Sequence, residues 1–167
     1  PGESRGLAYL LEHFGTMSPA DVAAPATRLA SGGWVVGAHL RESVGRTSAE
    51  EARALFTVEG DLPGPGDVLR NPALGRTLRR WAASSGEDLY TGSGGKAIVA
   101  EAAAAGGILT AADLAAYSPV ERDVVTWTYR GYTFISMPLP SSGGVVLAQA
   151  MSVLEGYDVA RLGHNSS

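Results

Sequence analysis

The chain has 167 residues, enough for one domain with a core, and 45% of them are hydrophobic, which excludes a disordered or fibrous protein. The net charge of −4 comes without a concentrated basic block, so we expect no nucleic-acid partner. Cysteine is absent, which rules out disulfides, thiolate metal sites and a cysteine nucleophile. No apolar stretch is long enough for a membrane-spanning helix, so we expect no membrane span.

Capping signals and hydrophobic spacing predict a series of helices between about residues 6 and 117. The clearest start is Ser18, an N-cap residue before a proline at the first helical position, and this helix should end at Gly32-Gly33. Pro25 inside it predicts a kink or a break. The other predicted helices cover residues 6–13, 36–44, 48–56 (from Ser48), 72–83 (capped by Asn71), 96–105 and 111–117 (capped by Thr110).

The hydrophobic pattern changes to a period of two near residue 124. Alternation on both sides of Arg130-Gly131 predicts a β-hairpin over about residues 124–137, with glycine supplying a positive φ in the turn. A last helix, over about residues 143–155, is apolar almost all round, which is typical of a buried helix. The predicted fold class is therefore mainly α with one β-hairpin, an α+β arrangement. Little chain remains to cover the last helix, so we expect exposed apolar surface and a possible homo-oligomer through it.

The junction between the hairpin and the last helix carries Pro140, Ser141, Ser142, Gly143 and Gly144. A serine nucleophile is disfavoured there, because the Gly-x-Ser-x-Gly spacing is absent and no histidine lies in a partner motif. A phosphate cradle is disfavoured because no P-loop lysine follows. The favoured interpretation is structural: one serine caps the helix, and the two glycines let it approach its neighbours closely.

The remaining candidate residues also favour structural interpretations. The glycine-rich stretch at residues 92–95, before Lys96, misses the P-loop spacing and is a weak candidate for anion binding. His13, His39 and His164 have no metal-ligand spacing, so we expect no metal site. We assign Arg76, Arg79 and Arg80 to a solvated helix face, and Trp34, Trp81 and Trp127 to core or interface anchors.

Several motifs together resemble those of the γ-glutamyltransferase (γ-glutamyltranspeptidase) family. Residues 106–117 are similar to its Gly-Gly-x-Leu-Thr…Asp-Leu-Ala-x-Tyr, residues 129–132 match its Tyr-Arg-Gly-Tyr hairpin, and residues 137–144 resemble its Met-Pro-Pro-Pro-Ser-Ser-Gly-Gly. Shorter matches at residues 14–17, 71–72, 89–92 and 154–158 extend the resemblance over nearly the whole chain.

The start of the chain departs from the family pattern. Pro1, Gly2 and Gly6 keep a Pro-Gly-x-x-x-Gly frame, but Glu3, Ser4 and Arg5 stand where the family has small or apolar residues. Leu139 replaces a proline, and Met151-Ser152 replaces a common Leu-Asn.

The resemblance implies an N-terminal nucleophile hydrolase with an αββα sandwich, which the hairpin would join. In this family a precursor cleaves itself, and the freed N-terminal threonine becomes the nucleophile with its own amino group as base. That threonine sits in a Thr-Thr-His or Ser-Thr-His context, which residues 1–167 lack. We therefore expect these residues to be a single fragment of the large subunit, with no catalytic residue and no assigned substrate-binding residue of its own.

The implied activity of the parent protein is cleavage of γ-glutamyl amides such as glutathione. The γ-glutamyl group would pass through an acyl-threonine to water, amino acids or peptides, with no cofactor. The expected partners are the rest of the large subunit and the small, nucleophile-bearing subunit, and the family suggests a periplasmic or extracellular location. The alternatives are a related acylase (cephalosporin or glutaryl acylase, or a poly-γ-glutamate-processing enzyme) and a non-enzymatic helical interaction domain.

Overall fold

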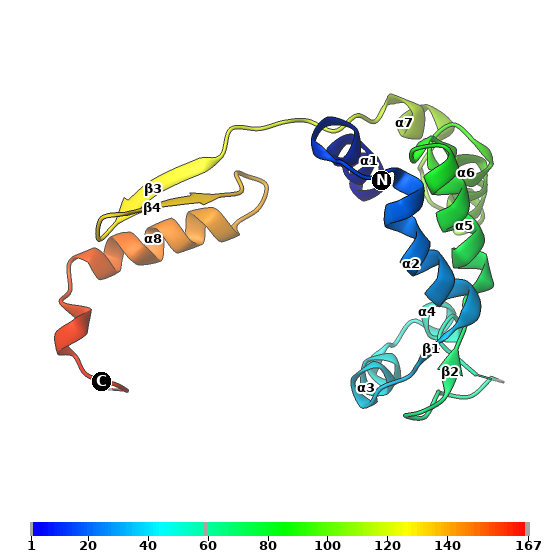
Figure 1. The fold of residues 1–167 in the computed structure, drawn as a ribbon, viewed down its shortest axis with the longest axis horizontal. Helices are drawn as coiled ribbons and strands as arrows, with labels where there is room; N and C mark the ends of the chain where they lie inside the picture. Colours follow the sequence, from blue (N-terminus) through cyan, green and yellow to red (C-terminus); the bar gives the residue numbers. More distant parts are fainter. Residues whose placement is uncertain (1, 59, 166–167) are drawn as a thin grey trace. The chain divides into compact units, whose positions relative to one another are not determined.

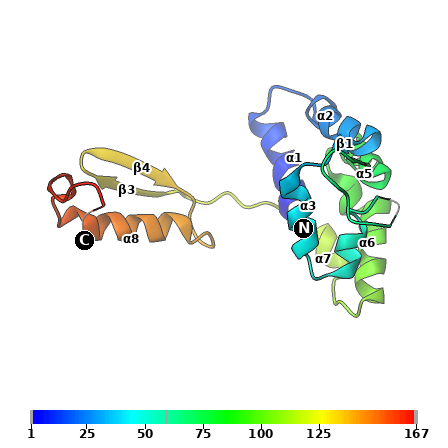
Figure 2. The ribbon, with the colours of Figure 1, turned by 90° about the horizontal axis from the view of Figure 1, so that it is seen from below.

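The computed structural model describes residues 2–58 and 60–165, so Pro1 of the Pro-Gly frame lies outside the described residues. The chain forms two compact units, Pro1–Pro119 and Val120–Ser167 (Figures 1 and 2). The first contains α1 (Gly2–Phe14), α2 (Pro19–Gly32), β1 (Trp34–Val35), α3 (Ala38–Arg46), α4 (Glu50–Ala54), β2 (Val68–Leu69), α5 (Pro72–Ala83), the 3₁₀ turn η1 (Glu87–Leu89), α6 (Ser93–Ala104) and α7 (Ala111–Ala116). The second contains β3 (Val125–Tyr129), β4 (Tyr132–Ser136), α8 (Gly143–Glu155) and the 3₁₀ turn η2 (Val159–Arg161).

Helices α2 and α5 pack against each other and form the centre of the first unit (Figure 1). Both begin where their caps predict. The Ser18 side chain accepts a hydrogen bond from the Asp21 N–H at 3.1 Å, and Asn71 accepts one from the Leu74 N–H at 2.9 Å. Of the kink or break predicted at Pro25, the break does not occur, because α2 continues through it. A proline removes one helical hydrogen bond, and packing against α5 holds the turns on both sides.

The core of the first unit is thin. Gly75 of α5 is buried against α2, and a Cβ built there would lie 2.3 Å from the Ser31 Oγ, so the two helices meet with little side chain between them. The buried hydrophobic residues are Ala23, Ala30, Val36, Val44, Leu69, Tyr90 and Leu114. Close approach of backbones, rather than large interlocking side chains, therefore holds the central helix pair together.

A short antiparallel ladder links the end of α2 to the start of α5. Trp34 of β1 pairs with Leu69 of β2, and the Val36 N–H donates to the Asp67 carbonyl at 2.8 Å. The prediction of helix from residue 36 is wrong, since Val36 is buried beside this ladder and α3 begins at Ala38. A two-residue strand gives no alternation in the sequence, and its partner lies far along the chain.

Two other helix starts test the capping signals. The helix predicted over residues 48–56 is shorter in the structure: α4 begins at Glu50, inside the predicted starting stretch, and its N-cap residue Ala49 makes no side-chain hydrogen bond. The predicted capping box of α7 is confirmed. The Thr110 hydroxyl accepts from the Asp113 N–H at 3.2 Å, and the Asp113 carboxylate accepts from the Thr110 N–H at 2.9 Å.

The second unit is a β-hairpin with one helix along it (Figure 1). Its register pairs Val125 with Ser136 and ends at a two-residue turn of Arg130 and Gly131, as predicted. The turn differs in one respect, because Arg130 also has a positive φ, of 50° against 83° at Gly131. Two positive φ angles in a two-residue loop define a type I′ turn, whose twist matches that of paired strands.

Helix α8 contacts the hairpin at an aromatic pair formed by the two strands. The Trp127 ring stacks on Phe134 with centroids 5.4 Å apart, and its indole N–H donates to the Met151 sulfur at 3.2 Å. The bounds of α8 agree with the sequence, but the helix is not buried all round in this chain. Gly144 is its one buried residue, whereas Val146 and Val153 are 56% and 64% exposed.

The exposed apolar surface of the second unit follows from the shortage of covering chain. Ile135 and Tyr132 on the hairpin are also mostly exposed.

Within the described residues, no helix has both the length and the hydrophobicity required to cross a bilayer.

Candidate functional site

The junction between β4 and α8 holds the serines and glycines singled out in the sequence. The chain turns over residues 138–141, where the Ser141 N–H donates to the Pro138 carbonyl at 3.1 Å and the peptide between Leu139 and Pro140 is cis. Helix α8 then begins at Gly143. Pro140 thus lies inside the tight turn that leads the chain from the hairpin into α8.

Neither serine caps α8 through its side chain. The N-cap residue is Ser142, whose carbonyl accepts from the Val146 N–H at 2.9 Å, but its hydroxyl makes no capping hydrogen bond. Its backbone has φ −77° and ψ −19°, which is helical. A capping side chain needs an extended N-cap backbone to reach the first free N–H groups, so the expectation of a serine cap is corrected.

Close packing at the junction depends on Gly144 alone. A Cβ built there would lie 2.8 Å from the Met137 carbonyl oxygen and 2.9 Å from the Ser136 Cβ. At Gly143 the nearest atom would be the Ser141 Oγ at 3.8 Å, which is ordinary contact. The absence of a side chain at Gly144 therefore lets the first turn of α8 lie directly against the end of β4.

An open hollow of about 670 Å³ lies beside this turn. Its lining residues are Glu121, Arg122, Asp123, Val125, Pro138, Leu139 and Val145. They include neither a serine nor a histidine, so the hollow contains no nucleophile paired with a base. The geometry of the junction is that of a packed connection between two elements.

The three histidines are exposed and lie on separate parts of the chain. His13 stacks on Tyr9 with ring centroids 3.9 Å apart, at the end of α1. In residues 2–58 and 60–165, no three histidine, aspartate or glutamate side chains gather closely enough to hold a metal ion.

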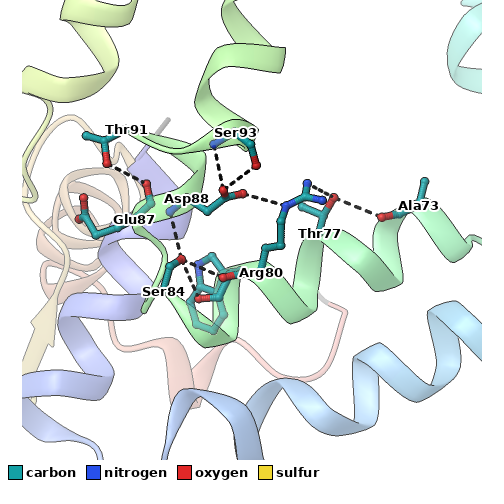
Figure 3. Close-up of polar contacts among 9 residues, drawn as sticks. Ala73, Thr77, Arg80, Ser84, Glu87, Asp88, Thr91 and Ser93 are labelled. Carbon is teal, nitrogen blue, oxygen red and sulfur yellow. Dashed lines mark hydrogen bonds and ion pairs between the residues drawn. The ribbon is translucent and has the colours of Figure 1, made fainter.

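The glycine-rich start of α6 is filled by a carboxylate of the protein itself (Figure 3). Asp88 Oδ1 accepts from both the N–H and the hydroxyl of Ser93 at 3.0 Å, and Oδ2 accepts from Arg80 Nε at 2.9 Å. A Cβ at Gly94 would lie 2.6 Å from Asp88 Oδ2, so glycine is required there. The N-terminus of α6 is therefore no free anion cradle, and Asp88 explains why this helix starts at Ser93 instead of residue 96.

Hydrogen bonds to the ionised carboxylate lower the pKa of Asp88. The largest contribution is the bond from Arg80, which outweighs the desolvation that would raise the pKa, and bonds from Ser93 and Gly94 act in the same lowering direction. Ser84 completes the network, because its hydroxyl accepts from the Asp88 N–H and donates to the Arg80 carbonyl (Figure 3). Arg76, Arg79 and Arg80 are exposed, as predicted for a solvated helix face, and Arg80 is in addition the ion-pair partner of Asp88.

A second polar cluster surrounds Arg5 of α1, whose side chain is 16% exposed. Its Nη2 donates to both carboxylate oxygens of Glu87 at 2.9 Å, and its Nη1 donates to the Tyr117 carbonyl. The guanidinium carbon lies 3.9 Å from the centre of the Tyr90 ring, which in turn stacks on Tyr117. Arg5 therefore connects α1 to η1 and to the end of α7.

The neighbouring Ser4 makes a similar connection. Its hydroxyl accepts a hydrogen bond from the indole N–H of Trp81 in α5 at 2.7 Å. Ser4 and Arg5, two of the residues that depart from the family pattern at the start of the chain, thus have specific partners. Sequence reasoning noted the departure at Ser4 and Arg5, but it could not pair them with residues far along the chain.

The comparisons with known proteins agree with the motifs. The sequence model of the family described as Gamma-glutamyltranspeptidase matches residues 1–167. This chain belongs to the γ-glutamyltranspeptidase family.

Relatives of this chain include proteins named as glutathione hydrolases and as acylases. The chain is 34% identical over 173 residues to the glutathione hydrolase proenzyme of Escherichia coli (strain K12), and 38% identical over 172 residues to the acylase ACY 1 proenzyme of Pseudomonas sp. (strain V22). All of the chain is covered in both cases, but it spans only 30% and 31% of these two relatives.

Solved structures of the family share the fold. The γ-glutamyltranspeptidase of Helicobacter pylori matches with a TM-score of 0.94 and 31% identity, covering 100% of this chain and 50% of that one. The cephalosporin acylase of Bacillus halodurans matches with a TM-score of 0.86 and 29% identity, covering 94% and 31%. The predicted fold class is thereby confirmed, and the non-enzymatic interaction domain is not supported, since these relatives are enzymes.

The two glycines at the α8 junction give a matched pair of substitutions. We expect Gly144→Ala to lower the free energy of unfolding by about 1–3 kcal/mol, because the backbone carbonyl of Met137, directly after β4, must move. Gly143→Ala should change it by less than about 0.5 kcal/mol. Urea unfolding followed by tryptophan fluorescence measures both, and equal effects would contradict the role given to Gly144.

The Asp88 network predicts a dependence on acid. Because the folded state lowers the pKa of Asp88, its stabilisation is complete above the unfolded value and is lost as pH falls through the folded value. The advantage of the wild type over Asp88→Asn in free energy of unfolding should therefore shrink below about pH 4. Asp113 has a pKa lowered by Thr110 and titrates in both proteins, so it cancels in the comparison. If the difference in free energy of unfolding between the wild type and Asp88→Asn stayed constant across the acid range, the role given to Asp88 would be contradicted.

Arg5 tests whether polar contacts anchor α1. Arg5→Lys keeps the charge but cannot bond both Glu87 and the Tyr117 carbonyl from two nitrogens and loses the flat contact with Tyr90, so we expect a loss of about 1–2 kcal/mol in free energy of unfolding. Arg46→Lys is the control, because its ion pair with Glu42 is well exposed and should contribute less than about 0.5 kcal/mol. If chemical unfolding showed the same small loss in free energy of unfolding for both variants, the role of Arg5 as the anchor of α1 would be contradicted.

Proposed function

We propose that this chain is the scaffold part of the large subunit of a γ-glutamyl-transferring enzyme, which cleaves γ-glutamyl amides such as glutathione through an acyl-threonine. The observation that carries the proposal is the family match over residues 1–167. The TM-score of 0.94 to the Helicobacter pylori γ-glutamyltranspeptidase supports it.

Within that enzyme, the second unit would contribute the hairpin and α8 to the sandwich. Their exposed apolar side chains, such as Ile135 and Val153, are what further layers of protein would cover. The nucleophile would come from the small subunit, and the acceptors of the γ-glutamyl group would be water, amino acids or peptides. Dimerisation through the same apolar surface is a second way in which this chain, expressed alone, could cover it.

A second candidate activity is amide hydrolysis by an acylase. The chain is 38% identical to an acylase proenzyme and 34% identical to a glutathione hydrolase proenzyme. This difference favours acylase activity as the second candidate. The full-length protein should be purified and offered a γ-glutamyl anilide, with and without a dipeptide acceptor, and a glutaryl amide of the same amine. Faster turnover of the γ-glutamyl amide with product transferred to the dipeptide supports the proposal, whereas preference for the glutaryl amide supports the acylase.

Residues 1–167 alone should be inert. No threonine of residues 1–167 stands in the Thr-Thr-His or Ser-Thr-His context in which self-cleavage would free the α-amino group that serves as base. Incubation with a chromogenic γ-glutamyl anilide should give the buffer rate, and no self-cleavage should appear on a denaturing gel.

The junction serines provide the decisive control for this expectation. A rate well above buffer that is lost in Ser141→Ala or Ser142→Ala would mean that the junction is catalytic and that its scaffold role is wrong. A rate that survives both substitutions would point to a contaminating enzyme.

A further inference from the structure

Arg130 has a backbone conformation with positive φ, which is disfavoured for a residue with a Cβ. It is the first residue of the type I′ turn between β3 and β4, with φ at 50°. Such turns favour asparagine, aspartate or glycine at this position, because a Cβ crowds the backbone when φ is positive. A side chain that remains at such a position points to a contact that only that side chain makes.

That contact joins the hairpin turn to the segment after α8. The Arg130 Nη2 donates to the Tyr157 carbonyl at 2.8 Å, a link across 27 residues of the chain. The guanidinium carbon also lies 5.1 Å from the centre of the Tyr129 ring. The cation–π contact with the Tyr129 ring favours this orientation of the Arg130 side chain over others.

The Tyr157 carbonyl is where two turns of the chain meet. Helix α8 ends at Glu155, and the Tyr157 N–H still donates to the Leu154 carbonyl at 3.1 Å. The Tyr157 carbonyl also accepts from the Val159 N–H at 3.0 Å, at the start of η2. A guanidinium at the C-terminal end of a helix is further favoured by the helix dipole.

We propose that Arg130 is a positioning residue that sets the direction in which the chain leaves α8. Its bond fixes the carbonyl of Tyr157, and that carbonyl in turn orients Val159 and η2. Asparagine or glycine at residue 130 would suit the turn better but could not reach Tyr157. Lysine could reach it with one donor, although without the planar group over Tyr129. The proposal concerns the course of the backbone and is independent of the reaction proposed above.

Amide hydrogen exchange of the protein, read by NMR, tests this inference. In Arg130→Asn the hairpin amides of Trp127 and Phe134, which form a hydrogen-bonded pair of the ladder, should keep their protection, because asparagine accepts the turn conformation. Exchange at Val159 and Leu162 should rise about tenfold as η2 loses its fixed start. Arg130→Lys should recover part of that protection.

The control is Arg122→Gln, which removes the same charge from an exposed position of the same unit and should leave both sets of amides unchanged. Unchanged exchange at Val159 and Leu162 in Arg130→Asn would overturn the proposal. Equal loss of protection in the hairpin and in η2 would also overturn it, because Arg130 would then serve the turn and not the segment after α8.

Discussion

The first unit depends on one carboxylate placed where three elements end or begin. Asp88 accepts hydrogen bonds from the first residues of α6 and from Arg80 of α5, while its own N–H is held by Ser84. One side chain thus caps a helix, pairs with a cation and fixes the turn between α5 and η1. Because Gly94 has no Cβ, the carboxylate can lie close to the first turn of α6, where its charge complements the helix dipole.

Packing in both units relies on close backbone contact more than on large side chains. Gly75 brings α5 onto α2, and Gly144 brings α8 onto β4. Such contacts fix geometry, because an added Cβ would meet the Met137 carbonyl oxygen at Gly144 and the Ser31 side chain at Gly75. They bury little apolar area, which agrees with the thin core of the first unit and the exposed face of α8. A scaffold of this kind fits one part of a larger family fold, in which the remaining layers supply the burial.

The sequence predicts the elements whose signals are local. Ser18, Asn71 and Thr110 mark their helices because a cap lies within a few residues of the groups that it satisfies. It misses the β1–β2 ladder and the Asp88 cap, because both depend on partners that no spacing rule reveals. The junction serines show the opposite error: Ser142 has the right residue type at the N-cap, but its backbone is already helical, so the side chain cannot bond. Family motifs predict the fold class well, since they summarise the long-range contacts that local patterns lack.

Detachment of helix α1 would respond weakly to heat and denaturant but clearly to added salt. None of its residues is buried, and its long-range ties include the ion pair of Arg5 and the hydroxyl of Ser4. Detachment of α1 alone would expose little apolar surface, so it would change heat capacity and denaturant sensitivity only slightly. Added salt, by contrast, would weaken the partly exposed ion pair. The end of the chain that carries the most unusual residues for its family could therefore open while calorimetry records an intact protein.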